Sequence, residues 1–264
     1  MSDVICPADR GTLSVEACLK CSLTWSNPCG YDYGILNAMF QKPNRDGIHV
    51  TDLTGCLRRA YYSKTMYVAV PVHSLLVLFS GTAMHDAFEK NCDDTSDCEL
   101  SLNADGIVGK ADRVYKDGVL VDYKTTRWMV PSRLPYGSHE LQLQIYAHML
   151  RKMNVPVKRA FIQYVDVSGP TKCIAGTKWA KCNTLVVLKN GVYKCPKCGK
   201  EFPDGHLGAY RVEVNIKEDI EHSLFQSRDM LQSSIDEGNP PLPEPGWLCG
   251  YCQYNGICDA AKGG

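Results

Sequence analysis

The chain has 264 residues, of which 44% are hydrophobic and 22% are charged, enough apolar chain to bury a sizeable core. Lys and Arg together number 29, as do Asp and Glu, so global charge is excluded as a means of binding nucleic acid, and local basic patches would be needed. The N-terminal stretch carries no export signal, and the apolar run at 75–79 is too short to span a bilayer. We therefore expect a soluble, cytoplasmic protein with no membrane partner.

Fourteen cysteines favour metal sites over disulfides in a chain without an export signal. Four is the ligand number of a closed zinc site and of an iron–sulfur cluster. The cysteines divide into three sets of four and a remainder, Cys92 and Cys98, most simply two free thiols. The sets are Cys6, Cys18, Cys21 and Cys29; Cys173, Cys182, Cys195 and Cys198; and Cys56, Cys249, Cys252 and Cys258.

Residues 1–34 contain the first set and few apolar residues, so we expect a small zinc-binding knuckle. The alternative is a loosely ordered segment in which some of these cysteines are ordinary buried thiols. A helix is expected from Thr51 or Asp52, and Cys56 in it would by itself be a core thiol. A second helix is expected at 74–91, where His85 alone is more simply an interior histidine than a ligand.

Two strands and a tight turn are predicted next, at 107–115 and 119–124. Asp122 and Lys124 lie two residues apart and leave the same face of their strand. Together with Asp112 on the partner strand, they could hold a divalent metal beside a group that handles a water, an arrangement suited to phosphodiester cleavage.

The length of the turn decides whether Asp112 can take part. A two-residue loop places Asp112 opposite Tyr123, on the wrong face, whereas a three-residue loop ending in a left-handed Gly118 places it opposite Asp122. The metal hypothesis therefore requires the longer loop or a bulge.

A third helix is predicted at 138–153, with Gln142 and Tyr146 one turn apart, either lining a cleft together or serving as unremarkable helix residues. A strand at 158–165 follows, and the element order indicates a mixed α/β sheet. A further strand at 210–216 and a helix at 217–237 resume the sheet after an insert.

The insert at 172–200 contains seven lysines and no acidic residue. Cys195-Pro-Lys-Cys198 is typical of a zinc ribbon, which Cys173 and Cys182 can complete. Lysines interleaved with aromatic rings suit a single-stranded nucleic acid, and a solvated lysine surface around a structural zinc is the alternative. The candidate DNA-binding residues are Lys178, Trp179, Lys181 and Tyr193.

The tail after the proline-rich stretch at 240–245 has three cysteines, which cannot close a four-ligand site. Cys56 is the candidate for the fourth ligand, because it lies outside the two complete sets and outside the acidic loop expected at 93–99, with which Cys92 and Cys98 are associated.

Four short motifs occur in one order over about 65 residues: Gly81…His85, Gly109-x-x-Asp112, Asp122-x-Lys124 and Gln142-x-x-x-Tyr146. This order resembles the RecB-type branch of the PD-(D/E)XK nuclease superfamily. The early cysteine and the three-cysteine tail make it most similar to the CRISPR-associated exonucleases of that branch and to the iron–sulfur nucleases of bacterial recombination. The resemblance covers roughly 50–166 and 209–260.

The resemblance implies a restriction-endonuclease-like mixed sheet flanked by helices, with a C-terminal iron–sulfur region. It implies Mg²⁺ or Mn²⁺ on His85, Asp112, Asp122 and the Tyr123 carbonyl, with Lys124 acting on the attacking water or the transition state. It also implies that Gln142 and Tyr146 line the DNA path. A [4Fe–4S] cluster would be held by Cys56, Cys249, Cys252 and Cys258.

We accordingly expect a zinc knuckle at 1–34, nuclease core at 45–171 and 206–264, and a zinc-ribbon insert at 172–205. The first and third of these depart from the family's compact plan and suggest a virus- or mobile-element-borne lineage. The expected activity is exonuclease cleavage of single-stranded DNA, in antiviral CRISPR spacer acquisition beside an integrase or in recombination beside a helicase. The alternative is a non-catalytic nucleic-acid-binding module. Oligomers, including rings, are compatible with the family.

Overall fold

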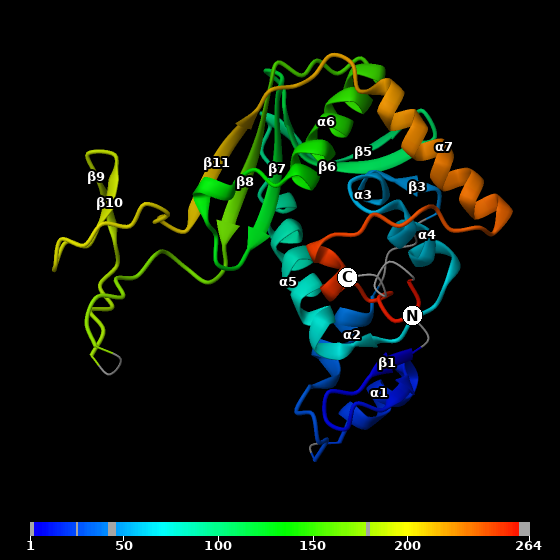
Figure 1. The fold of residues 1–264 in the computed structure, drawn as a ribbon, viewed down its shortest axis with the longest axis horizontal. Helices are drawn as coiled ribbons and strands as arrows, with labels where there is room; N and C mark the ends of the chain where they lie inside the picture. Colours follow the sequence, from blue (N-terminus) through cyan, green and yellow to red (C-terminus); the bar gives the residue numbers. More distant parts are fainter. Residues whose placement is uncertain (1–2, 25, 42–45, 178–179, 259–264) are drawn as a thin grey trace. The chain divides into compact units, whose positions relative to one another are not determined.

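The computed structural model describes residues 3–24, 26–41, 46–177 and 180–258, and Figure 1 shows its elements. The chain divides into two compact units. One comprises Met1–Asp86, Asp105–Gly109 and Asp219–Gly264, and the other Ala87–Ala104 and Lys110–Glu218. Within the described ranges, no helix is both long and apolar enough to cross a membrane.

The first unit begins with a three-stranded sheet and two helices. Strand β1 (Asp3–Ile5) pairs with β2 (Thr12–Ser14) and, in parallel, with β4 (Val70–Pro71); the helices are α1 (Val15–Ser22) and α2 (Tyr33–Phe40). Their apolar side chains form a core with the first turn of helix α5 (Val72–Glu89). The N-terminal segment thus completes its core with residues 70–75, which compensates for its own shortage of apolar residues. The buried members of this core are Val4, Cys18, Leu36, Met39, Val70, Val72 and Leu75.

The single helix expected from Thr51 is two helices, α3 (Val50–Leu53) and α4 (Leu57–Thr65). Asp52 accepts a hydrogen bond from the His49 N–H at 2.7 Å, which caps α3, and Cys56 is the N-cap of α4. Helix α7 (Glu221–Glu237) packs against α4 and begins four residues later than predicted. It ends at Gly238, whose φ of +70° suits glycine. Strand β3 (Ile48–His49) pairs in parallel with the first residues of β6, and a 3₁₀ helix, η2 (Trp247–Tyr251), lies in the tail.

The second unit is built on a mixed sheet with strand order β11-β8-β7-β6, and β5 also pairs with β6. Strand β8 runs parallel to β7 and antiparallel to β11, which confirms the mixed α/β sheet expected from the sequence. Helix α6 packs against β5 and β8, and the last turn of α5 contacts β7. The bounds are β5 Ser96–Ala104, β6 Ile107–Tyr115, β7 Val119–Thr126, α6 Gly137–Lys152, β8 Arg159–Asp166 and β11 Ala209–Val214, with a short 3₁₀ helix, η1, at Pro131–Arg133.

The core of this unit lies between the sheet and α6. Leu120 of β7, Ile162 of β8 and Leu143 of α6 are all fully buried. The alternating burial of β8 follows from its period of two, with the even-numbered residues facing inward. This packed layer supports the strands β6 and β7, which carry Asp112, Asp122 and Lys124.

Candidate active site

The turn between β6 and β7 has the register that the metal hypothesis requires. Arg113 pairs with Val121 and Val114 with Leu120, so the loop comprises residues 116–118. Gly118 has φ +92° and donates its N–H to the Tyr115 carbonyl at 2.9 Å. Continuing the register by one residue places Asp112 opposite Asp122, on the same face of the sheet. The three-residue loop is therefore confirmed.

The side chain of Asp112 is bonded to the backbone of the neighbouring strand β7. Its Oδ2 accepts a hydrogen bond from the Tyr123 N–H at 2.6 Å. The side chain of Asp112 is thus held against β7 by a charge-assisted bond, which fixes the direction of its second oxygen.

Asp122 and Lys124 form a close ion pair. The Lys124 Nζ lies 3.0 Å from Oδ1 and 2.8 Å from Oδ2 of Asp122. The side chain of Asp122 is 1% exposed and that of Lys124 is 17% exposed, so the ammonium lies at the edge of the buried layer. A buried carboxylate that shares its charge with one lysine can also accept a divalent cation.

Gln142 and Tyr146 of α6 are buried and bonded to each other, with Gln142 Nε2 donating to the Tyr146 hydroxyl at 2.9 Å. Burial raises the pKa of Tyr146, and the negative charges of Asp122, Asp112 and Glu99 raise it further. The phenol therefore stays protonated and lies among three carboxylates.

His139 and Tyr164 were not predicted as site residues, and both lie near the Asp122–Lys124 pair. The Nδ1 of His139 is 3.1 Å from the Tyr164 hydroxyl. Burial, followed by the positive charge of Lys124, lowers the pKa of His139 to about 4, and burial raises the pKa of Tyr164 to about 12. Neutral forms of both rings therefore border the site near pH 7. A single histidine among polar helix residues gives no sequence signal of this role.

Glu99 of β5 is a second residue that sequence reasoning missed. One of its carboxylate oxygens lies within 4.8 Å of an oxygen of Asp112. His85 lies on α5 in the first unit, so its part in the site remains a prediction, as does that of the Tyr123 carbonyl.

The cysteines of the insert converge. The sulfur atoms of Cys173 and Cys198 are 3.5 Å apart, those of Cys182 and Cys195 are 3.8 Å apart, and all four lie within 4.8 Å of one another. A tetrahedral site with Zn–S bonds of about 2.3 Å has sulfur–sulfur edges of about 3.8 Å. The four thiols therefore fit a single zinc ion.

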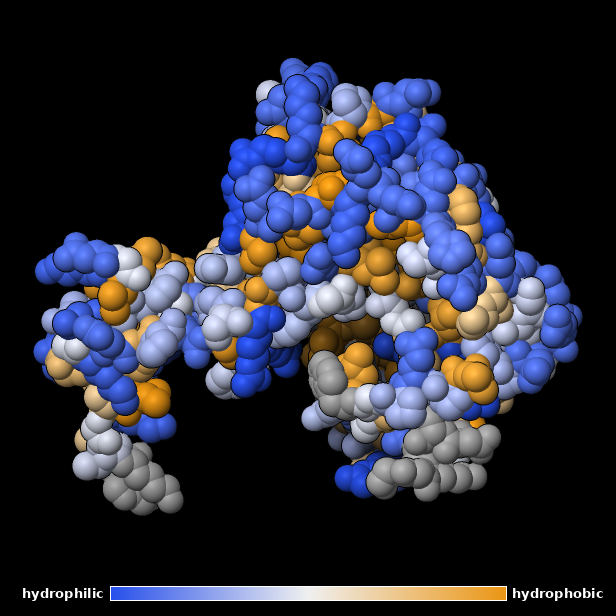
Figure 2. Space-filling view, turned by 45° about the horizontal axis from the view of Figure 1, so that its top comes forward, coloured by the Kyte–Doolittle hydropathy of each residue, from blue (hydrophilic) through white to orange (hydrophobic). Residues whose placement is uncertain are grey.

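The surface of the insert combines lysines with aliphatic side chains, and Figure 2 shows the two kinds interspersed at the left of the view. Strands β9 (Val187–Lys189) and β10 (Val192–Lys194) form its hairpin. Lys181 is exposed and Tyr193 is half-buried. The predictions for Lys178 and Trp179 fall outside the described residues.

The N-terminal cysteines lie in one neighbourhood. Burial, with the charges of Cys29, Cys6 and Cys21, raises the pKa of Cys18 to about 11. Within the described part of the chain, no three of these four sulfurs lie within 4.8 Å of one another, whereas all four sulfurs of the insert do. Zinc binding here stays a prediction.

The C-terminal tail contacts the helix that Cys56 begins. Tyr254, between Cys252 and Cys258, is 3% exposed, and its ring centroid lies 5.5 Å from that of Tyr62 in α4. The four cysteines of this set are half-buried free thiols. The iron–sulfur cluster on these four cysteines stays a prediction.

Cys92 and Cys98 form a disulfide, so the expectation of two free thiols is wrong. The segment between them folds into a tight turn, with Cys92 Sγ 3.4 Å from the Ser96 carbonyl oxygen. This turn brings together two thiols that are six residues apart, a proximity that spacing alone does not reveal.

Three solved structures are similar to the chain. "Crystal structure of SSO0001" shares the fold at a TM-score of 0.51 and 19% identity, covering 85% of this chain and 91% of that one. The alkaline exonuclease LHK-Exo of Laribacter hongkongensis gives a TM-score of 0.41 at 7% identity, with 73% and 89% covered. A phage-related exonuclease from Haemophilus somnus 129PT gives 0.34 at 12%, with 59% and 67% covered.

A search of curated proteins finds no match. The family model of the PD-(D/E)XK nuclease superfamily matches residues 84–259, about two thirds of the chain, including the β6–β7 hairpin and α6. The chain belongs to the PD-(D/E)XK nuclease superfamily.

Proposed function

We propose that the protein is a divalent-metal-dependent DNA exonuclease that acts mainly on single strands. The observation that carries this proposal is the β6–β7 register, which places Asp112 opposite Asp122 with Lys124 paired to it. Two carboxylates and a lysine on adjacent strands are the chemical requirements of metal-assisted phosphodiester hydrolysis.

The metal would be held by Asp112, Asp122, His85 and the Tyr123 carbonyl. Hard oxygen donors with one imidazole suit Mg²⁺ and Mn²⁺. When bound, the cation supplies Lewis-acid polarisation of a phosphate oxygen and lowers the pKa of a water. His85 is proposed as a ligand from its place in the ordered motifs and from its imidazole.

Lys124 would orient the attacking water and stabilise the charge that develops on the phosphate. Asp122 fixes the ammonium from both of its oxygens, so little reorganisation is needed when the substrate binds. Gln142 and Tyr146 would line the DNA path and exclude bulk water. Because His139 is neutral near pH 7, it adds no second positive charge beside Lys124.

The ribbon would bind zinc on Cys173, Cys182, Cys195 and Cys198 and grip the strand that leads to the site. Its lysines would contact phosphates, and aromatic rings, Tyr193 and Trp179 among them, would stack on bases. Exposed Lys181 and the lysines of the β9–β10 hairpin support this function.

A [4Fe–4S] cluster on Cys56, Cys249, Cys252 and Cys258 would fasten the tail to α4, where Tyr254 already packs. Anaerobically purified protein should then absorb near 400 nm, and Cys252→Ser should abolish that absorbance. A colourless anaerobic wild type would contradict the cluster. The N-terminal four cysteines would hold a second zinc ion.

The resemblance to CRISPR-associated nucleases supports a cytoplasmic setting in spacer acquisition beside an integrase. Recombination beside a helicase, in a phage or mobile element, is the other setting of such nucleases.

The function is tested with single-stranded DNA labelled at the 5′ end or the 3′ end, incubated anaerobically with Mn²⁺. An exonuclease should release label as mononucleotides or short oligonucleotides from one end first. Internal fragments from both substrates would show an endonuclease instead. DNA that is shifted on a gel but left intact with Mn²⁺ and Mg²⁺ would favour the non-catalytic binding module.

A further inference from the structure

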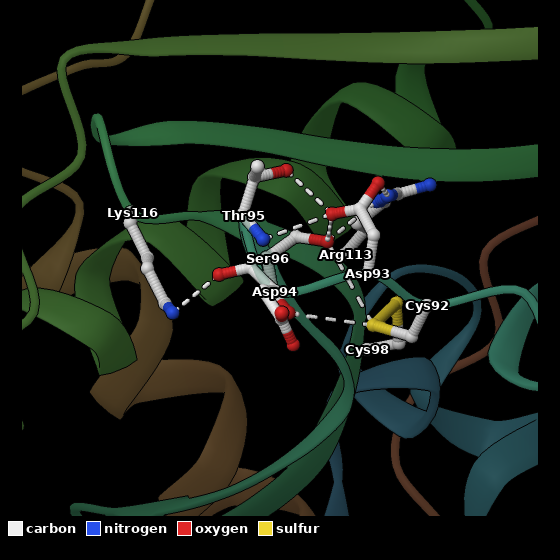
Figure 3. Close-up of polar contacts among 8 residues, drawn as sticks. All are labelled: Cys92, Asp93, Asp94, Thr95, Ser96, Cys98, Arg113 and Lys116. Atoms are coloured by element: carbon white, nitrogen blue, oxygen red, sulfur yellow. Dashed lines mark hydrogen bonds and ion pairs between the residues drawn. A yellow bond between two sulfur atoms is a disulfide. The ribbon is translucent and has the colours of Figure 1, made fainter.

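The segment from Cys92 to Cys98 is a closed ring attached to β6 (Figure 3). Arg113 of β6 donates from Nε to Ser96 Oγ at 2.9 Å and from Nη2 to Asp93 Oδ2 at 2.8 Å. Lys116 donates to the Asp94 carbonyl. The ring is thus bonded to two cationic residues that flank the β6 end of the hairpin.

Asp93 is charged where it meets Arg113. Hydrogen bonds from the Thr95 hydroxyl and N–H, followed by that from Arg113, lower the pKa of Asp93 to about 2. Asp93 is therefore ionised near neutral pH, where it forms an ion pair with Arg113.

Glu99 follows the ring directly and is held in an unusual backbone conformation. Its φ is +49°, in the left-handed region that glutamate seldom adopts. Its side chain is 13% exposed and lies 2.8 Å from the Nζ of Lys110. Such a conformation persists where the surroundings determine it, and the disulfide-closed ring on one side with Lys110 on the other does so here.

We propose that Glu99 is an additional ligand of the divalent metal in the nuclease site. This inference rests on the proposed function. One Glu99 oxygen already lies within 4.8 Å of an Asp112 oxygen, a separation that one cation coordinated by both would span.

The charge balance of the site supports a cation at this position. Glu99, Asp112 and Asp122 contribute three negative charges, and Lys110 and Lys124 contribute two positive charges, which leaves −1. The Lys110 side chain is 50% exposed, and such an ion pair is weak and easily exchanged. A divalent cation can therefore replace Lys110 as the partner of Glu99 at little cost.

The test is calorimetric titration of zinc-loaded, full-length protein with Mn²⁺. Glu99→Gln should weaken Mn²⁺ binding by at least about tenfold, the loss expected when even an outer-shell partner of a metal is removed. Asp97→Asn, a matched change at an exposed position on the same strand, should bind as the wild type does. Circular dichroism checks that each variant is folded.

Two further variants separate the outcomes. If Glu99→Gln binds like the wild type while Asp122→Asn binds more weakly, Glu99 is not a ligand and the proposed function stands. If Asp122→Asn also binds like the wild type, the metal site itself is wrong. Lys110→Gln should leave Mn²⁺ affinity equal or higher. If Lys110→Gln weakened Mn²⁺ binding as much as Glu99→Gln does, Glu99 would serve only its pairing with Lys110 between the strands. That result would overturn the inference.

Discussion

The β6–β7 hairpin and the cysteine-containing insert at 172–200, the ribbon, both present charged side chains. The two regions hold these side chains in place by different means. The hairpin lies in a sheet whose core residues are fully buried, so Asp122 and Lys124 are positioned by packing. The ribbon has aliphatic side chains exposed on both strands of its hairpin, Leu188 at 50% and Val192 at 41% among them. Its hairpin has little buried apolar surface, and its four cysteine sulfurs lie within 4.8 Å of one another. The proposed function thus assigns the chemistry to the region where packing gives precision, and the contacts with single-stranded DNA to the region where less precision is needed.

The largest expected effect comes from Asp122→Asn. The change keeps the shape of a side chain that is 1% exposed but removes the charge that is proposed to bind the metal and that pairs with Lys124. Loss of several kcal/mol of transition-state stabilisation corresponds to a fall in cleavage rate of roughly 10³-fold. The rate is measured under single-turnover conditions with Mn²⁺. Asp117→Asn, in the exposed turn of the same hairpin, is the control and should cleave normally.

The second-largest expected effect comes from Cys195→Ser, which should disturb the insert at 172–200 and leave the sheet intact. Cys195→Ser removes a sulfur that is 1% exposed and would open the proposed zinc site. Limited proteolysis should then cut within 172–200, while the thermal transition of the sheet changes little because the ribbon contributes little to that core. A cooperative loss of both regions would contradict their independence.

The smallest effect concerns pH and the edge of the active site. The pKa of His139 is lowered from 6.5 to about 4 in the folded protein, so the unfolded chain binds more protons between these values. Its contribution to stability is complete above pH 6.5 and is lost as the pH falls towards 4. His139→Gln should therefore reduce the difference in Tm between pH 7.5 and pH 5. Each kcal/mol removed corresponds to about 2–4 °C. Equal differences in both proteins would show that His139 does not contribute.

Much of the sheet could be predicted, because periodicity and turn residues act locally. Strands β6, β7, β8 and β11, helix α6 and the shared face of Asp122 and Lys124 follow from spacing and periodicity. Strand β5 was not predicted, because the acidic residues at 93–99 indicated a loop, whereas the strand begins at Ser96. The register of Asp112 could not be decided, since loops of two and three residues are both compatible with Asp117-Gly118. In the structure the Gly118 carbonyl accepts a hydrogen bond from the Lys158 N–H at 2.8 Å, a contact 40 residues away along the chain that local spacing does not reveal.

Other features depend on contacts that sequence does not encode locally. Glu99 is one of several acids at 93–99, and only its backbone conformation and its distance from Asp112 distinguish it. The break between α3 and α4 at Thr54–Cys56 follows from Gly55 and from the capping by Asp52, which a helical pattern of apolar residues obscures. The N-terminal core depends on residues 70–75, far along the chain.

Lys124 is proposed to act at the reaction centre, and the most direct test of this role is the single-turnover cleavage of single-stranded DNA with Mn²⁺. Lys124→Ala should be about 10²- to 10³-fold slower than the wild type, as when one preorganised donor to a transition state is removed, with unchanged DNA affinity. Lys90→Ala, at an exposed site after α5, should cleave at the normal rate. Equal cleavage by wild type and Lys124→Ala would contradict a centre on the β6–β7 hairpin.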